Sequence, residues 1–149
     1  MNDELSDLYQ DVILDHSRHP RNRRPMPDAD RQAQGYNPLC GDEVTVYLKL
    51  AGDDLADVSF TGRGCAICTA TASIMTETTR GNKQAAALAM FEKFHDLLTH
   101  AGTEPTEELG ELAALTGVRR FPMRVKCATL PWHTLRAALL SEGKPVSTE

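Results

Sequence analysis

The spacing of apolar residues changes along the chain, and each change predicts a different kind of element. Over residues 4–16, apolar side chains recur at helical intervals and predict an amphipathic helix; they are Leu5, Leu8, Tyr9, Val12 and Ile13. Pro20 is expected to close this helix, and a loop rich in Pro, Arg and Asp follows to about residue 35. Residues 31–36 within this loop are an additional candidate for a strand.

The period becomes two in the next segment. Over residues 44–50, apolar and polar side chains alternate and predict a half-buried strand. The turn sequence AGDD follows, and a second strand is expected over residues 55–61. The two strands are predicted to form an antiparallel hairpin. Gly62 and Gly64 are expected to end the second strand.

Helical patterns dominate the second half of the chain. Helices are predicted over residues 66–79, 83–98 and 107–115, the first closed by Gly81 and the third preceded by an acidic loop. A turn or short helix is expected up to Cys127, and then a helix with Pro131 in its first turn. Because strands come early and helices late, we expect one α+β domain over residues 1–149, with a small antiparallel sheet of about three strands packed against helices.

Composition agrees with this picture and excludes some classes of function. The 149 residues are 41% hydrophobic and 25% charged, the mixture of an ordinary globular protein. No apolar run approaches the roughly 20 residues that span a bilayer, and the acidic start of the chain does not resemble a secretory signal. We therefore expect a cytoplasmic protein without membrane contact. The net charge of -5 argues against a nucleic-acid partner.

One basic cluster, HSRHPRNRRP over residues 16–25, runs against this acidic background. It is interpreted first as a solvated loop and second as a docking patch for an acidic protein surface. RNA binding ranks third, because no aromatic residues interleave with the charges. His95, His100 and His133 are each interpreted as solvated side chains rather than ligands.

Four cysteines carry the candidate chemistry: Cys40, Cys65, Cys68 and Cys127. In a reducing cytosol, four cysteines at uneven spacings favour a metal site or reactive thiols over disulfides. Cys40 lies in a Pro/Gly loop, and Asp42, two residues further along an extended segment, projects to the same side.

The other thiols have surroundings that favour the thiolate. Cys65 lies at a helix start, where the positive end of the helix dipole stabilises negative charge. Cys127 follows Lys126 and Arg124, whose cations would do the same if they point at the sulfur. Three thiolates and one carboxylate make a plausible tetrahedral zinc site, although thiolates also suit iron–sulfur clusters.

Cys68 completes a CAIC motif with Cys65 and has three interpretations. The pair is a redox dithiol, or Cys68 replaces Asp42 in an all-thiolate zinc site, or Cys68 fills a small buried position on the helix. The redox interpretation lacks the surrounding βαβ pattern. We favour the small buried position.

Taken together, the segments LYQDVILDHSRHPRN, NPLCGDEV, FTGRGCAICTATASIMT and GVRRFPMRVKCATLPW resemble the U-type iron–sulfur cluster assembly family, and specifically its SufU branch. The chain is also similar to the related IscU scaffolds. The stretch between Cys65 and Cys127 is longer than in IscU-like proteins, and Lys126 stands where those proteins have a histidine ligand.

This resemblance implies a SufU/IscU-like fold and zinc ligation by Cys40, Asp42, Cys65 and Cys127. It also implies that Arg124 matches a basic position near the metal. Cys68 departs from the family pattern, which has a serine-like small residue there, and so remains an alternative ligand.

The implied function is that of a zinc-dependent sulfurtransferase. Cys40 would accept persulfide sulfur from a SufS-like cysteine desulfurase and relay it to a downstream iron–sulfur scaffold. Two alternatives stay open: a scaffold that assembles a nascent cluster on the same cysteines, with iron in place of zinc, and a non-enzymatic, zinc-containing regulator of the desulfurase.

Overall fold

The structure, a computed structural model, describes residues 3–100, 102–140 and 146–147, with side chains described for residues 9–100 and 102–140. The elements follow in the order α1 (Asp3–Arg18), β1 (Arg31–Asn37), β2 (Asp42–Ala51), β3 (Asp54–Arg63), α2 (Ala66–Thr79), α3 (Gln84–Thr99), the 3₁₀ segment η1 (Glu107–Arg120), α4 (Pro122–Leu139) and β4 (Val146–Ser147). The expected α+β class is confirmed.

The sheet has the strand order β3-β2-β1-β4. β2 pairs antiparallel with both neighbours, and Val46 lies opposite Ala33 on one side and Phe60 on the other. All three predicted strands are confirmed, including the candidate over residues 31–36. The two-residue β4, which pairs in parallel with β1, was not predicted.

The sequence predicted that Gly62 would end its strand, and the structure shows that it does not. It pairs with Val44 inside β3, which runs on to Arg63. Its φ of 133° is a backbone angle that residues with a side chain rarely adopt. A Cβ there would lie 2.1 Å from the carbonyl oxygen of Glu43. The glycine therefore allows a close backbone approach within the sheet rather than a break.

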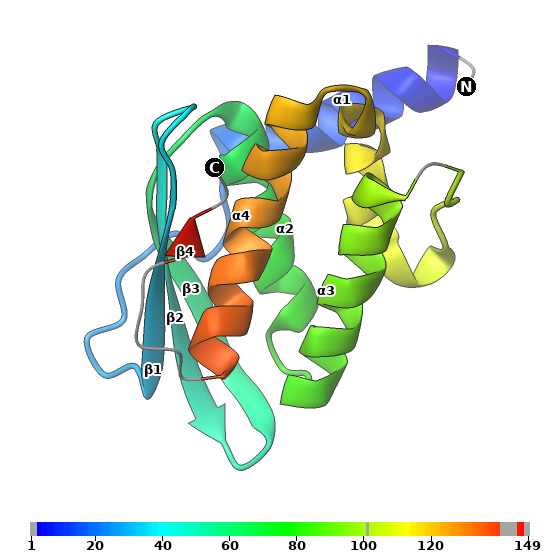
Figure 1. The fold of residues 1–149 in the computed structure, drawn as a ribbon. Helices are drawn as coiled ribbons and strands as arrows, with labels where there is room; N and C mark the ends of the chain where they lie inside the picture. Colours follow the sequence, from blue (N-terminus) through cyan, green and yellow to red (C-terminus); the bar gives the residue numbers. More distant parts are fainter. Residues whose placement is uncertain (1–2, 101, 141–145, 148–149) are drawn as a thin grey trace.

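Helices α2 and α4 cover one face of the sheet, and α3 packs on the side of these helices away from it (Figure 1). α1 crosses one end of the helical layer and contacts α2 and η1. Trp132 of α4 and Phe94 of α3 are fully buried in the core, with ring centroids 5.7 Å apart. Among the described residues, no helix is both long and apolar enough to cross a membrane.

Helix α4 runs unbroken through Pro131, so the predicted break after Cys127 is wrong. Proline removes the hydrogen bond that its nitrogen would donate to the Cys127 carbonyl, at a cost of about 3 kcal/mol. Burial on both sides outweighs this cost, because Leu130 and Trp132 are both fully buried. Pro122, in the first turn, is the proline that begins the helix.

The segment predicted as a short helix over residues 107–115 is instead a longer 3₁₀ segment. Gly110, with φ 51° and ψ -128°, interrupts the helical backbone inside it. The predicted cap of α2 is confirmed, because Gly81 follows the C-cap Arg80 with φ 85°.

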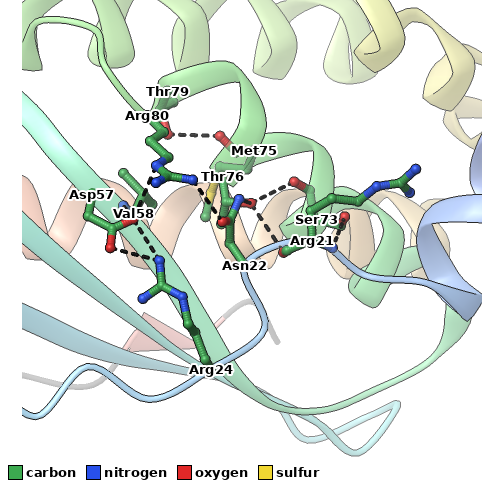
Figure 2. A network of polar contacts seen from close by, with 10 residues as sticks. All are labelled: Arg21, Asn22, Arg24, Asp57, Val58, Ser73, Met75, Thr76, Thr79 and Arg80. Atoms are coloured by element: carbon green, nitrogen blue, oxygen red, sulfur yellow. Dashed lines mark hydrogen bonds and ion pairs between the residues drawn. The ribbon is translucent and has the colours of Figure 1, made fainter.

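The basic cluster at residues 16–25 is used for internal contacts. Arg24 donates two hydrogen bonds to Asp57, at 2.8 and 2.7 Å, and Arg80 approaches the same carboxylate (Figure 2). Asn22 donates its amide to Thr76 at 3.0 Å, also in Figure 2. These contacts fix the loop after α1 to β3 and α2, so the contacts support a structural role for the cluster.

Two histidines predicted to be solvated are not. His16 is 1% exposed; its Nδ1 lies 2.7 Å from Ser73 Oγ and its Nε2 lies 3.1 Å from Glu111 Oε2, so it ties α1 to α2 and η1. His133 is half-buried against the rings of Phe91 and His95. Burial, and then the neighbouring His95, lowers the pKa of His133.

The contact between β1 and α4 depends on Gly35. A Cβ at this position would lie 2.1 Å from Thr134 Oγ1 and 3.0 Å from Leu130 Cδ1, both on α4. We expect Gly35→Ala to lower the free energy of unfolding by about 1–3 kcal/mol through overpacking. Denaturant titration measures this.

The matched control is Gly117→Ala, where none of the described residues lies within 4 Å of the added Cβ. It should leave stability unchanged or raise it by up to about 1 kcal/mol. Equal losses in both variants would contradict the close approach of β1 and α4.

Candidate metal centre

Cys40 lies in the short loop, residues 38–41, that joins β1 to β2. The N–H groups of Cys40 and Gly41 both donate to the Asn37 carbonyl, at 3.2 and 2.9 Å, and Gly41 takes a φ of 74° that favours glycine. This turn leaves Cys40 exposed and starts β2 at Asp42, which is 1% exposed.

Three of the predicted ligands converge in space. The side-chain ligand atoms of Cys40, Asp42 and Cys127 all lie within 4.8 Å of one another. They come from the hairpin loop, the start of β2 and the second turn of α4, so the close packing of α4 on the sheet creates the cluster. Cys127 is buried, whereas Cys40 is open to solvent.

The Asp42 carboxylate belongs to this cluster, and only one of its two oxygens has a hydrogen-bond partner among the described residues. Its Oδ1 accepts a hydrogen bond from the backbone N–H of Cys65 at 2.9 Å. Its Oδ2 is buried and has no hydrogen-bond partner among the described residues. A buried carboxylate oxygen without a partner costs free energy, and a cation held between it and the thiols would remove that cost. Two thiols beside a carboxylate are donors that suit zinc.

Cys65 adjoins the cluster from the N-cap of α2, the position that the sequence predicted. Its Sγ accepts a hydrogen bond from the backbone N–H of Cys68 at 3.4 Å. Its sulfur is not one of the three grouped ligand atoms, but its backbone N–H holds Asp42 in place.

The electrostatics around Cys127 differ from the expectation. Burial raises the pKa of this thiol, and its contacts with Asp42 and Cys40 raise it further. The sequence predicted that Arg124 and Lys126 would favour the thiolate if they pointed at the sulfur, and neither cation is among the causes of this shift. The Arg124 guanidinium instead stacks over the Phe121 ring, 4.7 Å from its centroid, while Lys126 is half-buried beside Cys127.

Two residues at this centre were not predicted from the sequence. Asn37 is fully buried, and its Nδ2 donates to Cys127 Sγ at 3.6 Å. Gly64 leaves room for the carboxylate, since a Cβ there would lie 2.8 Å from Asp42 Oδ1. The position of Asn37 directly before the Cys40 loop was the available signal for its role.

Cys68 lies on the first turn of α2 and is 3% exposed, within the hydrophobic core. The added Cβ at Gly64 would also lie 3.2 Å from Cys68 Cβ, so this residue is close to Asp42. Burial raises the pKa of the Cys68 thiol well above its ordinary value, and the charges of Asp42, Cys65 and Cys40 add to this effect.

This α+β fold gathers two thiols and a buried carboxylate between a hairpin and a helix, a donor set that could hold a metal ion. The model of the NifU-like N-terminal domain family matches residues 8–128, and the chain belongs to this family.

Two of its relatives carry different descriptions. The chain is 39% identical over 141 residues to the zinc-dependent sulfurtransferase SufU of Bacillus subtilis (strain 168), covering 95% of both chains. It is 37% identical over 136 residues to the iron–sulfur cluster assembly scaffold protein IscU of Streptococcus pyogenes serotype M1, covering 91% of this chain and 85% of that one.

A solved structure agrees with this family. The crystal structure of a candidate iron–sulfur cluster assembly scaffold for the SUF system, from thermophilic Fervidobacterium islandicum AW-1, superposes with a TM-score of 0.80. The two chains are 38% identical, and the match covers 86% of this chain and 93% of that one. The predicted SufU/IscU-like fold is confirmed.

The unpartnered Asp42 oxygen gives a test whose sign depends on metal. In the metal-free protein, Asp42→Asn should leave the free energy of unfolding unchanged or raise it by about 1–3 kcal/mol, because an amide keeps the acceptor for Cys65 N–H without a buried charge. With zinc added, the variant should gain less thermal stability than the wild type. Calorimetry with and without zinc measures both.

The control is Glu43→Gln, an exposed neighbour whose carboxylate pairs with exposed Arg63 in the part of the chain that the structure describes. It should behave like the wild type in both conditions. A large loss of stability in metal-free Asp42→Asn would contradict the view that this carboxylate is uncompensated without a cation.

Proposed function

We propose that this protein is a zinc-dependent sulfurtransferase of iron–sulfur cluster assembly, which accepts persulfide sulfur on Cys40 from a cysteine desulfurase and relays it to a scaffold. The observation that carries this function is an exposed thiol on a hairpin loop within 4.8 Å of a buried carboxylate and a buried thiol. The name of the Bacillus subtilis relative supports the same activity.

Four residues would hold the zinc: Cys40, Asp42, Cys65 and Cys127. When bound, zinc supplies Lewis acidity without redox chemistry, which keeps the thiols deprotonated and lowers their nucleophilicity. Asp42, Cys65 and Cys127 lie at the starts of a strand and two helices, which are packed into the fold. Cys40 alone lies on a loop, so it is the ligand that can leave with the least disturbance of the structure.

The transfer step follows from the position of Cys40. Its thiolate attacks the outer sulfur of the desulfurase persulfide, a bond forms between Cys40 Sγ and that sulfur, and the sulfur–sulfur bond of the donor breaks. The desulfurase cysteine leaves as a thiolate, and Cys40 becomes the persulfide. The charges of Arg124 and Lys126, near the start of α4, would attract the persulfide and the leaving thiolate of the desulfurase.

The surface next to the site suits a protein partner such as a SufS-like desulfurase. A groove of about 480 Å³ runs between α1, η1 and the start of α4, and Ile67 and Phe121 are among its lining residues. Ile67 lies two residues from Cys65 along α2. Leu39, directly before Cys40, exposes 59% of its surface, so an apolar contact is available beside the acceptor thiol.

Scaffolding is the second candidate, because the Streptococcus pyogenes relative is named as a scaffold protein. Under that function, the same cysteines would hold iron and a nascent cluster. Metal analysis of freshly purified protein separates the two candidates. One zinc per chain supports sulfur transfer, whereas bound iron with visible colour after anaerobic reconstitution supports scaffolding.

The acceptor thiol can be tested by substitution. Cys40→Ser should fold, because the side chain is exposed, but it should fail to take up labelled sulfur from a desulfurase. Gel autoradiography under non-reducing conditions measures the label. Cys68→Ser is the matched control and should take up sulfur like the wild type. Uptake by Cys40→Ser at the wild-type rate would show that another residue is the acceptor.

A further inference from the structure

Cys65 and Cys68 occupy the N-cap and the third position of α2, so they share one face at the start of the helix. Cys65 has extended backbone angles, with φ -68° and ψ 169°, and its Sγ accepts the Cys68 backbone N–H at 3.4 Å. Cys65 is exposed, and Cys68, three residues later, is buried. An accessible thiol therefore lies beside an inaccessible one, and the function proposed above leaves Cys68 unused.

We propose that Cys65 and Cys68 form a redox-active dithiol, which small-molecule disulfides convert to an intramolecular disulfide. The site is thus an oxidation site at the N-terminus of α2. Oxidised low-molecular-weight thiols are the oxidant.

Cys65 is the thiol that such a reagent meets first. It is exposed, whereas Cys68 is enclosed by the core. The Sγ of Cys65 accepts the backbone N–H of Cys68 at 3.4 Å, so the sulfur already lies against the residue that would resolve a mixed disulfide. Cys40 is also exposed, but the N–H groups of Cys40 and Gly41 are already bonded to the Asn37 carbonyl and are not available to its sulfur.

The reaction balances as two exchanges. Cys65 thiolate attacks one sulfur of the disulfide RSSR, and one RS⁻ leaves, giving a mixed disulfide on Cys65. Cys68 then attacks Cys65 Sγ, and the second RS⁻ leaves. The two cysteines lose two protons and two electrons, which the two leaving thiols carry away as 2 RSH. Burial disfavours the Cys68 thiolate, so the second exchange is the slower step, but it is intramolecular between positions three residues apart at the start of one helix.

Oxidation would also change the metal site. Cys65 is one of the proposed zinc ligands, so a Cys65–Cys68 disulfide removes one donor. This effect on zinc rests on the proposed function, whereas formation of the disulfide does not. Reduced thiols would reverse the modification, which couples zinc affinity to the ratio of oxidised to reduced small thiols.

The test exposes metal-free wild type, Cys68→Ser and Cys40→Ser to oxidised glutathione, followed by intact mass measurement and peptide mapping. The wild type should lose the mass of two hydrogen atoms, carry no lasting adduct and yield a peptide with Cys65 linked to Cys68. Cys68→Ser should instead retain a glutathione adduct on Cys65. Cys40→Ser is the matched control and should behave like the wild type.

Two outcomes would overturn the proposed redox-active dithiol. A disulfide between Cys40 and Cys127, whose sulfurs are also close, would show that oxidation occurs at this pair and not at Cys65 and Cys68. A lasting adduct on Cys65 of the wild type would show that Cys68 cannot resolve it.

Zinc affinity of the oxidised wild type, measured by chelator competition, tests the link to the metal separately. It should fall by more than about tenfold, because losing a ligand costs more than losing an outer contact. An unchanged affinity would remove Cys65 from the ligand set and leave the dithiol standing.

Discussion

The crowding of two thiols around the buried Asp42 carboxylate is the constraint on which the rest of the centre depends. This carboxylate is 1% exposed, one of its oxygens has no partner among the described residues, and two thiols lie within 4.8 Å of it. The same crowding raises the pKa of buried Cys127. A bound cation would reverse each of these costs at once, because it favours the charged form of every donor around it. The fold therefore holds an arrangement that is unfavourable alone and favourable with a metal.

The fold divides the donors between packed elements and an exposed loop. Cys127 lies on a helix that packs against β1 through the close approach at Gly35, and Asp42 begins the central strand β2. Asn37 reaches Cys127 from the end of β1, so the strands on both sides of the loop that carries Cys40 are anchored. The Cys40 side chain itself stays exposed. Under the proposed function, this division would let Cys40 exchange partners while the other donors keep the site intact.

Much of the fold could be predicted from local patterns. Alternation and turn signals predicted β2 and β3, β1 was an additional candidate, and the Gly-bracketed Cys65 marked the start of α2. Pro131 was misjudged because a local rule about proline was applied where buried Leu130 and Trp132 decide the outcome. His16 was assigned to a solvated loop because its partners, Ser73 and Glu111, are far away in the sequence.

The site was predicted less completely than the fold. Cys40 and Asp42 are two residues apart in one extended segment, so their proximity follows from strand geometry. Cys127 joins them only through the packing of α4, and the family resemblance rather than the spacing pointed to it. Asn37 and Gly64 were missed because an amide and a missing side chain carry no chemical signature in a sequence.

X-ray absorption spectroscopy of the zinc-loaded protein tests the convergence of these donors most directly. The spectrum should fit three sulfur ligands and one oxygen ligand, and it should be unchanged in Cys68→Ser. A fit to four sulfurs would exclude Asp42. A fit dominated by nitrogen and oxygen would show that the thiols do not meet at the metal.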